Sequence, residues 1–414
     1  MIGNAEFKFH PIGQGCFYSG IIHVDAAKFH LVYDCGTNSP EHFLLSEIED
    51  YKTMMAGNPL DLLMISHFHK DHVNGVFKLL RGLTCKNLII PYYPPIERLI
   101  LALTADGTDD DYIEFLKDPV TYLYARDYNI ERIIIVGGPN DNQDSDQLIN
   151  REGVSPEDGI TPGKLILQMD LYDDEEIEDW VKRNEENKER YLDPNVKFLK
   201  KPYRVWLPYW EFVFYLEKYD EILLVEKVST EIDTLIKSKN LSISDLFEKK
   251  YLKELEKIYK SYFTNLNNTS LVTYHGPYNN TANPDQMICC YSTYVHDFYW
   301  RSLPTHCCGT LLTGDIELER LASIEKLKDY YKFYWKRICY FQVPHHGSEN
   351  NWNRTEPNGL HEFPVYIINH GLGRKKHPSL EVVKYINTHC TNGIIKLCNE
   401  AEKFEYGCEF IEKL

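Results

Sequence analysis

Three histidines and one aspartate lie within six residues of each other, directly after a short apolar segment, in LLMISHFHKDHVNG. They are His67, His69, Asp71 and His72. Residues 61–66 have the apolar pattern of a short buried strand, and residues two apart on an extended chain point to the same side. His67 and His69 are therefore expected to reach one ion. Imidazole and carboxylate ligands together suit zinc, iron or manganese, which predicts a metal site.

Two later segments also place metal-type residues where an apolar strand ends. Asp315 follows the apolar run in GTLLTGD, and His345 and His346 follow the apolar run in RICYFQVPHHGS. In layered α/β folds, active sites collect at one edge of a sheet, where strands end. The sequence therefore predicts one site built from three strand ends, with one or other of the adjacent histidines as a ligand.

Apolar strand patterns alternate with amphipathic helices on both sides of a long charged segment. Residues 1–137 and 264–414 carry the strand patterns, which predicts the two halves of one domain. Residues 138–263 contain charged helical stretches and are expected to form a mostly helical insertion that is not part of the core sheet. The expected helices in this insertion are 174–192, 229–240 and 243–263.

The composition limits the functions that the chain can have. It has 414 residues, 43% of them hydrophobic, and a formal net charge of −17. A protein that grips long nucleic acid over a broad face is usually basic, so the acidic balance argues against that class. The apolar runs are too short to cross a bilayer and no secretory leader is visible, which predicts a cytoplasmic protein without a membrane contact. The 11 cysteines have no framework spacing and are expected to be free thiols.

The segment HFHKDH resembles the H-x-H-x-D-H signature of the metallo-β-lactamase fold. The order of FHPIGQGCF, LVYDCGT, HFHKDHVNG, NNTSLV, LLTGD, VPHHGS and HPSLEVV is similar to the hydrolase domain of the bacterial competence DNA-uptake channel and to its stand-alone relatives. The matching blocks cover about 1–95, 264–275 and 308–400. The resemblance implies an α/β (α+β) fold, the four-layer αββα sandwich of that family, interrupted by one helical insertion.

The same resemblance implies two metal ions held by the residues of these motifs. His67 and His69 are expected to bind the first ion, Asp71 and His72 the second, and Asp315 to bridge both. The third histidine that many enzymes of this fold carry before the bridging aspartate is absent from its usual place. His275, a few residues after the NNTSLV segment, is an alternative ligand or an ordinary loop histidine. His345 or His346 supplies a further ligand.

The segment RKKHPSL predicts a corner that binds a phosphate group. Its proline is expected at the first position of a helix, which makes His377 the expected N-cap. Backbone N–H groups at a helix start favour an anion, and three basic residues precede this histidine. In the resembling family a G-H-P-S histidine stands here, with glycine where this chain has Lys376. The candidate substrate-binding residues are Asn268, Ser270, Arg374, Lys375, Lys376 and His377.

These residues predict a dinuclear metal-dependent hydrolase with two zinc or manganese ions. A hydroxide that bridges two cations is expected to attack phosphorus, which indicates a phosphodiesterase or nuclease acting on nucleic acid or a nucleotide. Asp71, Asp315 and His377 are the expected catalytic residues. One alternative is a hydrolase of a small carboxylic or phosphocholine-type ester. Another is a subunit of a bacterial assembly, for example in defence, gated by a protein partner that binds the helical insertion.

Overall fold

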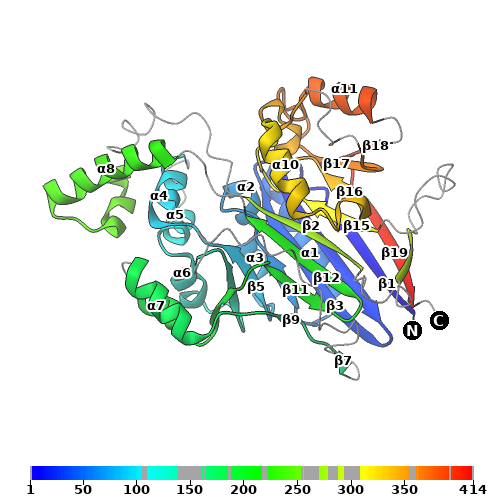
Figure 1. The fold of residues 1–414 in the computed structure, drawn as a ribbon, viewed down its shortest axis with the longest axis horizontal. Coiled ribbons are helices and arrows are strands. Elements are labelled where there is room, and N and C mark those ends of the chain that lie inside the picture. The colour runs from blue at the N-terminus through cyan, green and yellow to red at the C-terminus, as the bar shows by residue number, and fades with distance from the viewer. Residues whose placement is uncertain are drawn as a thin grey trace.

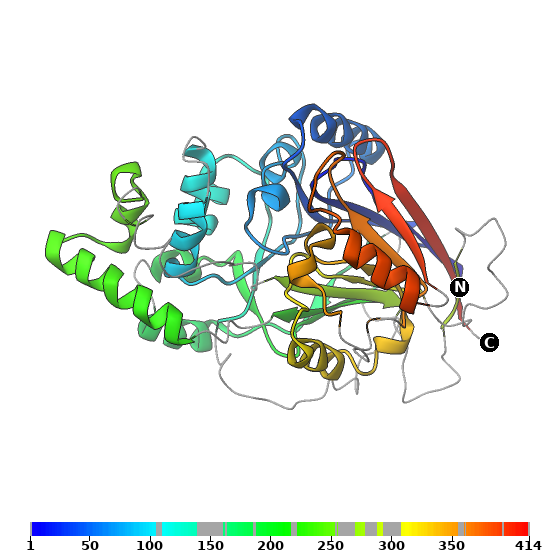
Figure 2. The same cartoon turned by 90° about the horizontal axis from the view of Figure 1, so that it is seen from above.

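The structure is a computed structural model in which two large β-sheets lie face to face (Figures 1 and 2). It describes residues 2–104, 110–138, 160–161, 164–184, 188–216, 222–252, 255, 270–277, 288–292, 308–354, 360, 362–390 and 393–412.

The first sheet has nine strands within these ranges. In spatial order they are β10 (Val196–Leu199), β6 (Ile133–Val136), β5 (Leu88–Pro91), β4 (Leu62–Met64), β3 (Ala27–Thr37), β2 (Gly15–Val24), β1 (Ile2–Phe9), β19 (Phe404–Glu412) and β14 (Ile288–Ser292).

The second sheet has eight strands in the described part of the chain. Their order is β18 (Ile394–Cys398), β17 (Val365–Asn369), β16 (Ile338–Gln342), β15 (Gly309–Leu312), β13 (Leu271–Pro277), β12 (Trp210–Leu216), β11 (Arg204–Leu207) and β9 (Gln168–Met169). A separate two-stranded ribbon is formed by β7 (Ile160–Thr161) and β8 (Lys164–Leu165).

Helices cover the outer faces of both sheets (Figure 2). On the first sheet lie α1 (Glu41–Met55), α2 (Lys70–Val73), α3 (Val76–Leu79), α4 (Pro95–Thr104), α5 (Asp110–Lys117), α6 (Pro119–Ala125) and α7 (Asp174–Asn184). On the second lie α10 (Leu321–Tyr330) and α11 (Leu380–His389). Further helical elements are α8 (Ile222–Lys239) and the 3₁₀ turns η1 (Lys188–Leu192), η2 (Ile243–Phe247), η4 (Trp335–Arg337), η5 (His345–Gly347) and η6 (Glu349–Asn351).

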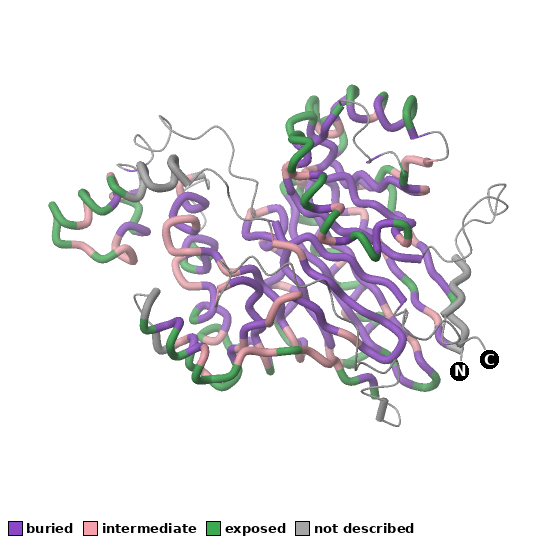
Figure 3. Tube along the Cα trace, in the orientation of Figure 1, coloured by how far each residue is buried: buried purple, intermediate pink, exposed green. Residues whose placement is uncertain are grey.

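Three buried apolar cores separate these four layers. Figure 3 shows that the strands of the sheets are largely buried. Residues that alternate along one strand divide between two of the cores. In β3, Val32 packs on the helices of the first sheet, whereas Leu31 and Tyr33 face the second sheet. This alternation is the pattern of a strand that is buried on both sides. The expected αββα sandwich is therefore confirmed.

The expectation that residues 138–263 stand outside the core sheet is wrong for part of that segment. β10 extends the first sheet beside β6, and β11 and β12 join the second sheet. Most apolar side chains of β11 and β12 fill the core between the sheets, whereas Val196 and Phe198 of β10 pack on the helices of the first sheet. In the sequence these strands are only short apolar runs, and the charged helical stretches on either side of them dominate the composition of residues 138–263. Of the expected helices, α7 and α8 are present. The third, expected over 243–263, begins with the 3₁₀ turn η2, and residues 253–254 and 256–263 lie outside the described ranges.

No helix in the described ranges is long and apolar enough to cross a membrane. Eight cysteines whose side chains the structure describes are free thiols in buried positions, namely Cys16, Cys35, Cys85, Cys308, Cys339, Cys390, Cys398 and Cys408.

Replacing Phe341 with alanine is expected to lower the free energy of unfolding by about 3–5 kcal/mol, because it opens a cavity in a packed core. Phe341 is fully buried in β16 and stacks on Phe363, with ring centroids 4.5 Å apart. Phe333, which is 43% exposed, is the matched control. Its alanine variant is expected to change stability by less than about 0.5 kcal/mol in urea unfolding. Equal losses in the two variants would contradict this core assignment.

A buried histidine ties α1 to the first sheet. His10, directly after β1, places Nδ1 2.7 Å from Glu47 Oε2 on α1 and Nε2 2.8 Å from Ser19 Oγ on β2. Lys8 also donates to Glu47 Oε2, at 2.7 Å. Burial lowers the pKa of His10 to about 4, more than the hydrogen bond to Glu47 raises it. His10 is therefore neutral in the folded chain at pH 7.

This shift predicts how stability changes with pH. The unfolded chain protonates His10 near its ordinary pKa of 6.5, whereas the folded chain does so only near 4. The contribution of neutral His10 to the free energy of unfolding is fully present above pH 6.5. About 3 kcal/mol of it is lost as the pH falls from 6.5 towards 4. The free energy of unfolding of His10→Gln, measured with urea, is therefore expected to fall less steeply over this pH range than that of wild type. The exposed His42→Gln is the control, and a wild-type slope in His10→Gln would contradict the prediction.

Candidate metal centre

The loop that carries the first two candidate ligands is fixed by Asp34 in β3. Asp34 accepts hydrogen bonds from the backbone N–H of Ser66, at 2.7 Å, and from its hydroxyl, at 2.6 Å. The Asp34 backbone has a φ of 54°, in the left-handed region that aspartate tolerates better than most residues. This fully buried carboxylate therefore fixes the chain where it leaves β4, one residue before His67.

Two glycines let the strands approach the backbone of α2 closely. A Cβ at Gly36 would lie 2.7 Å from backbone atoms of Asp71 and His72, and one at Gly15 would lie 2.7 Å from the carbonyl oxygen of Asp71. These distances exclude any side chain without a shift of the backbone. The glycines of the QGC and CGT segments therefore allow Asp71 and His72 to sit against the strands.

Asp315 lies at the centre of the cluster, directly after β15. Its Oδ2 is 3.5 Å from His67 Nε2, 3.9 Å from His69 Nδ1 and 3.8 Å from His345 Nε2. Its Oδ1 is 3.3 Å from His72 Nε2. The two oxygens of one carboxylate thus face two different sets of histidines, which is the arrangement that a ligand shared by two cations needs.

His346 completes the second set. Its Nε2 lies 3.3 Å from Asp71 Oδ2. Ligand atoms of Asp71, His72 and His346 lie within 4.8 Å of one another, as do those of His67, His72 and Asp315. The two adjacent histidines therefore take different places, with His345 beside Oδ2 of the central carboxylate and His346 beside Asp71. His345, and not His275, lies where a third histidine of the first set would be.

The backbone of the HHG turn explains how neighbouring histidines reach different sets. His345 and His346 have φ values of 46° and 56°, both in the left-handed region. Two such residues in a row are strained, and strain of this kind is concentrated at functional sites. The turn therefore directs both imidazoles to the cluster.

The ligand-type atoms at the centre fit a cation. Nε2 of His67, His72 and His346 and Oδ1 of Asp315 are buried and form no hydrogen bond within the described residues. Buried polar atoms without a partner are costly, and they are rare in folded proteins. Neutral imidazole nitrogens and carboxylate oxygens are the donor set of zinc and manganese. Bound cations would satisfy all four atoms, so these residues fit a divalent metal centre.

The other ring nitrogen of four histidines is held by a neighbouring group. This second layer orients each imidazole and selects the tautomer that leaves Nε2 for a metal. The Nδ1 partners are Ser66 Oγ for His67 (2.8 Å), Asp34 Oδ2 for His72 (2.7 Å), Asn351 Oδ1 for His345 (2.7 Å) and the Asn369 carbonyl oxygen for His346 (3.0 Å).

Buried charges set the protonation states of the cluster. Burial lowers the pKa of His67 to about 3, and His72 acts in the same direction. Burial opposes a charge on His72, but Asp315 and Asp34 outweigh it and raise the pKa of His72 well above its ordinary value. Burial would raise the pKa of Asp315, but His345, His72 and His67 hold it well below the ordinary value. The central carboxylate is thus ionised, the form that binds a cation.

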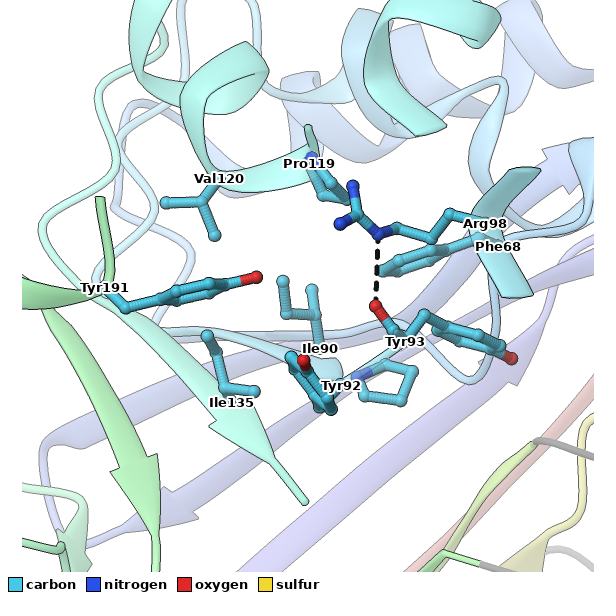
Figure 4. A pocket seen from close by; sticks show the side chains of 10 residues that line it. Phe68, Ile90, Tyr92, Tyr93, Arg98, Pro119, Val120, Ile135 and Tyr191 are labelled. Carbon is cyan, nitrogen blue, oxygen red and sulfur yellow. Dashed lines mark hydrogen bonds between the residues drawn. The ribbon is translucent and has the colours of Figure 1, made fainter. Parts of the chain in front are cut away.

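Phe68 lies between His67 and His69 in the chain and holds their loop against the core under the helices of the first sheet. Its ring packs on Tyr93 and Phe115, with centroids 4.8 and 4.9 Å apart, and its carbonyl oxygen accepts a hydrogen bond from Tyr112. The buried Arg98 donates to the carbonyl oxygen of Tyr93 at 3.1 Å (Figure 4). The pocket that Phe68, Tyr93 and Arg98 help to line has a volume of about 10 Å³. That is room for one water molecule, so this pocket is structural and is not a substrate site.

His377 lies beside the cluster but does not cap a helix, so that expectation is wrong. α11 begins at Leu380, and the hydroxyl of Ser379 accepts the Glu381 N–H at 3.3 Å. Serine is the better cap because its hydroxyl reaches a free N–H of the first turn. The ring of His377 is 5.2 Å from that of His345, which places it at the rim of the metal centre.

Gln14, which the sequence did not single out, lies in the loop between β1 and β2 and connects that loop to the segment that carries His377. Its Nε2 lies 3.4 Å from His377 Nδ1, and its Oε1 accepts the N–H of Gly371. Burial lowers the pKa of His377 to about 4, and His345 and His346 act in the same direction. His377 is therefore neutral in this structure. The basic residues before it, Arg374, Lys375 and Lys376, are exposed.

Two other candidate residues, Ser270 and His275, lie in buried positions away from a substrate-facing surface. Ser270 is fully buried and its hydroxyl accepts the N–H of Asp315 at 3.0 Å, so it supports the central carboxylate and does not face a substrate. His275 lies in the core between the sheets, where Nε2 is 2.8 Å from the Tyr18 hydroxyl, because β13 directs it away from the cluster. Asn268 lies outside the described residues.

Comparisons with known proteins give weak likenesses. No protein-family model matches the chain, and no curated protein matches it. Among solved structures, the metallo-β-lactamase fold protein YhfI from Bacillus subtilis is 9% identical over 97% of this chain and 99% of that one, with a TM-score of 0.35. The metallo-β-lactamase MIM-1 from Novosphingobium pentaromativorans is 18% identical over 20% of this chain and 31% of that one, with a TM-score of 0.14. The subclass B3 enzyme MEM-A1 from a soil metagenome is 20% identical over the same shares, with a TM-score of 0.13. Likenesses of this size do not define a function, which has to come from the His/Asp cluster itself.

Proposed function

We propose that this chain is a dinuclear metal-dependent hydrolase that cleaves phosphodiester bonds, with zinc or manganese as the metal. The observation that carries the proposal is the convergence of five histidines on Asp315 and Asp71. The Nε2 atoms of His67, His72 and His346 are buried and form no hydrogen bond among the described residues. Two cations held here would activate water at neutral pH and neutralise charge on the substrate oxygens.

The protein supplies orientation and charge around that centre. Asp315 faces one set of ligands with each oxygen, which fixes the two sets relative to each other. His377, neutral and at the rim, offers a ring nitrogen to a substrate oxygen. Exposed Arg374, Lys375 and Lys376 lie just before it in the chain. They supply local positive charge that favours a phosphate over an uncharged ester.

The acidic chain favours a restricted kind of phosphodiester. With a net charge of −17, a broad electrostatic grip on long duplex DNA is unfavourable. A short, single-stranded or small cyclic substrate needs positive charge only near the scissile bond. This proposal therefore places the activity in the nuclease and phosphodiesterase class, on small or single-stranded substrates.

The division into two ligand sets predicts metal counts. After reconstitution with zinc or manganese, mass spectrometry is expected to find about two metals per chain. His69→Gln and His346→Gln remove ligands from different sets, so each is expected to retain close to one metal. His42→Gln, an exposed histidine on α1, is the matched control and is expected to keep both.

The same protein is then tested for hydrolysis of bis(p-nitrophenyl) phosphate, a single-stranded oligonucleotide and p-nitrophenyl acetate. Metal-dependent cleavage of the phosphodiesters supports the proposal. Two metals with metal-dependent cleavage of the carboxylic ester alone would replace the substrate class. No bound metal after reconstitution would overturn the catalytic role of the cluster.

A further inference from the structure

A pocket of about 610 Å³ opens on the outer face of the first sheet, beside α1. Its floor is formed by β1, β2 and β19, and α1 contributes one wall. Polar residues of the floor and wall include Lys8, His10, Ser19 and Asp50. The lining residues include no member of the metal cluster. The pocket is large enough for a small-molecule ligand.

Ser19, His10 and Glu47 form a hydrogen-bonded series at this pocket. Ser19 Oγ lies 2.8 Å from His10 Nε2, and His10 Nδ1 lies 2.7 Å from Glu47 Oε2. Both distances fall in the range of short, direct hydrogen bonds. A hydroxyl, an imidazole and a carboxylate in this order are the three parts of an activated nucleophile: the nucleophile, its base and the group that orients the base.

The proton positions in this series follow from the charge of Glu47. Burial raises the pKa of Glu47, but hydrogen bonds from His10 and Lys8 outweigh it and lower the pKa to about 2. The ionised carboxylate can only accept, so Nδ1 of His10 must carry a proton. A neutral His10 then leaves Nε2 as an acceptor for the Ser19 hydroxyl. This is the tautomer in which an imidazole can remove a proton from serine.

The packing of the series keeps this arrangement fixed. His10 stacks on Phe17, with ring centroids 3.8 Å apart, and Tyr51 of α1 meets it edge-on. Lys8 is the direct cross-strand partner of Ser19. Their side chains therefore lie next to each other on the same face of the sheet. Lys8 thus brings a positive charge near the Ser19 hydroxyl, where negative charge would develop on an attacked carbonyl.

We propose that Ser19, His10 and Glu47 form a second, metal-independent nucleophilic site that accepts small carboxylic esters. Ser19 and His10 are the catalytic residues, and Glu47 is a positioning residue that acts through His10. The site is separate from the metal centre, so it stands or fails independently of the proposed phosphodiesterase activity.

The reaction balances with water as the second reactant. Ser19 Oγ forms a bond to the ester carbonyl carbon while its proton passes to His10 Nε2. The carbon–oxygen bond to the alcohol then breaks, and the alcohol leaves with that proton. Water, deprotonated by the same Nε2, attacks the acyl group, which releases the acid and returns the proton to Ser19. Lys8 lies near the charge that develops on the carbonyl oxygen.

The test is covalent labelling of the full chain by a fluorophosphonate probe in the presence of a chelator. Ser19 Oγ displaces fluoride at phosphorus, and the proton leaves through His10. Peptide mass spectrometry is expected to find the adduct on Ser19. The labelling is expected to be lost in Ser19→Ala and to slow by about 100-fold in His10→Gln. Hydrolysis of p-nitrophenyl acetate is measured in parallel on the same metal-free samples.

Matched variants separate this role from a structural one. Ser46→Ala changes an exposed serine on the same helix as Glu47 and is expected to label at the wild-type rate. Glu47→Gln is expected to slow labelling, and Glu47→Asp, which keeps the carboxylate, to restore part of the rate. Thermal unfolding confirms that each variant is folded.

Two outcomes overturn the proposal. One is folded wild-type protein with unmodified Ser19 under conditions in which the probe labels a known serine hydrolase. The other is labelling that Asp315→Asn removes, since the adduct would then depend on the metal centre. The first outcome needs no variant, so a folding defect cannot obscure it.

Discussion

Replacing Asp315 with asparagine is expected to lower phosphodiester hydrolysis by about 10³-fold, because the variant loses the charge that both ligand sets share. The amide has the shape of the carboxylate, and its backbone N–H still reaches Ser270. It presents only one carbonyl oxygen, so the histidines beside Oδ1 and Oδ2 can no longer both face an acceptor. Metal content is expected to fall below two per chain. Steady-state kinetics and mass spectrometry on the same samples measure both effects.

Asp329→Asn is the control for this substitution. Asp329 is an exposed aspartate on α10, and the variant is expected to keep wild-type metal content and activity. Circular dichroism and thermal unfolding show whether each variant is folded. Full activity with two metals in Asp315→Asn would mean that this carboxylate is not shared, and the dinuclear proposal would fail.

Replacing Asp34 with asparagine is expected to weaken metal binding by about 10- to 100-fold, although Asp34 is not itself a ligand. In the folded chain Asp34 accepts from His72 Nδ1 and from both donors of Ser66. An amide can accept at one atom only. If its NH₂ faces His72, the imidazole must place its proton on Nε2, the atom that faces Asp315. If its oxygen faces His72, the NH₂ opposes the N–H of Ser66.

Asp61→Asn is the matched control, because Asp61 is also a buried aspartate at the first sheet. It accepts the backbone N–H of His30 and pairs with Lys86, away from the metal ligands. Its variant is expected to lose stability but to bind metal normally. Isothermal titration calorimetry with zinc measures the metal affinity of the two variants and of wild type. Equal affinities in Asp34→Asn and wild type would show that the tautomer of His72 does not control binding.

The sequence singled out the residues that cluster in the structure because they are local signals. His67, His69, Asp71 and His72 are close in the chain, and Asp315 follows an apolar run, as the strand-end rule requires. It did not single out Asp34, which ends the apolar part of LVYD in the same way, because its role depends on a contact 38 residues away with His72. Such second-layer contacts form only when the chain folds.

The strands in 196–216 were missed for a different physical reason. VWLPYWEFVFYL contains two apolar runs separated by a Pro-Tyr turn, the pattern of a hairpin, and β11 and β12 pair there in the structure. The charged helices around this hairpin give the whole segment a polar, helical pattern in the sequence. Short strands buried on both faces resemble buried helix segments, so periodicity alone could not separate them. The sequence also could not show where His275 lies, because only the pairing of β13 with β12 and β15 fixes the face of the sheet to which its side chain points.

The last strand of the fold has a consequence for biosynthesis. β19 lies between β1 and β14, and Ile2 pairs with Ile411 across the sheet. While the chain emerges from the ribosome, β1 can pair with β2 but keeps its other edge open until residues 404–412 have been made. An open strand edge is a template for pairing with other chains. The nascent protein is therefore exposed to aggregation at this edge from the synthesis of β1 until that of β19, and a chain truncated before residue 404 keeps that edge open permanently.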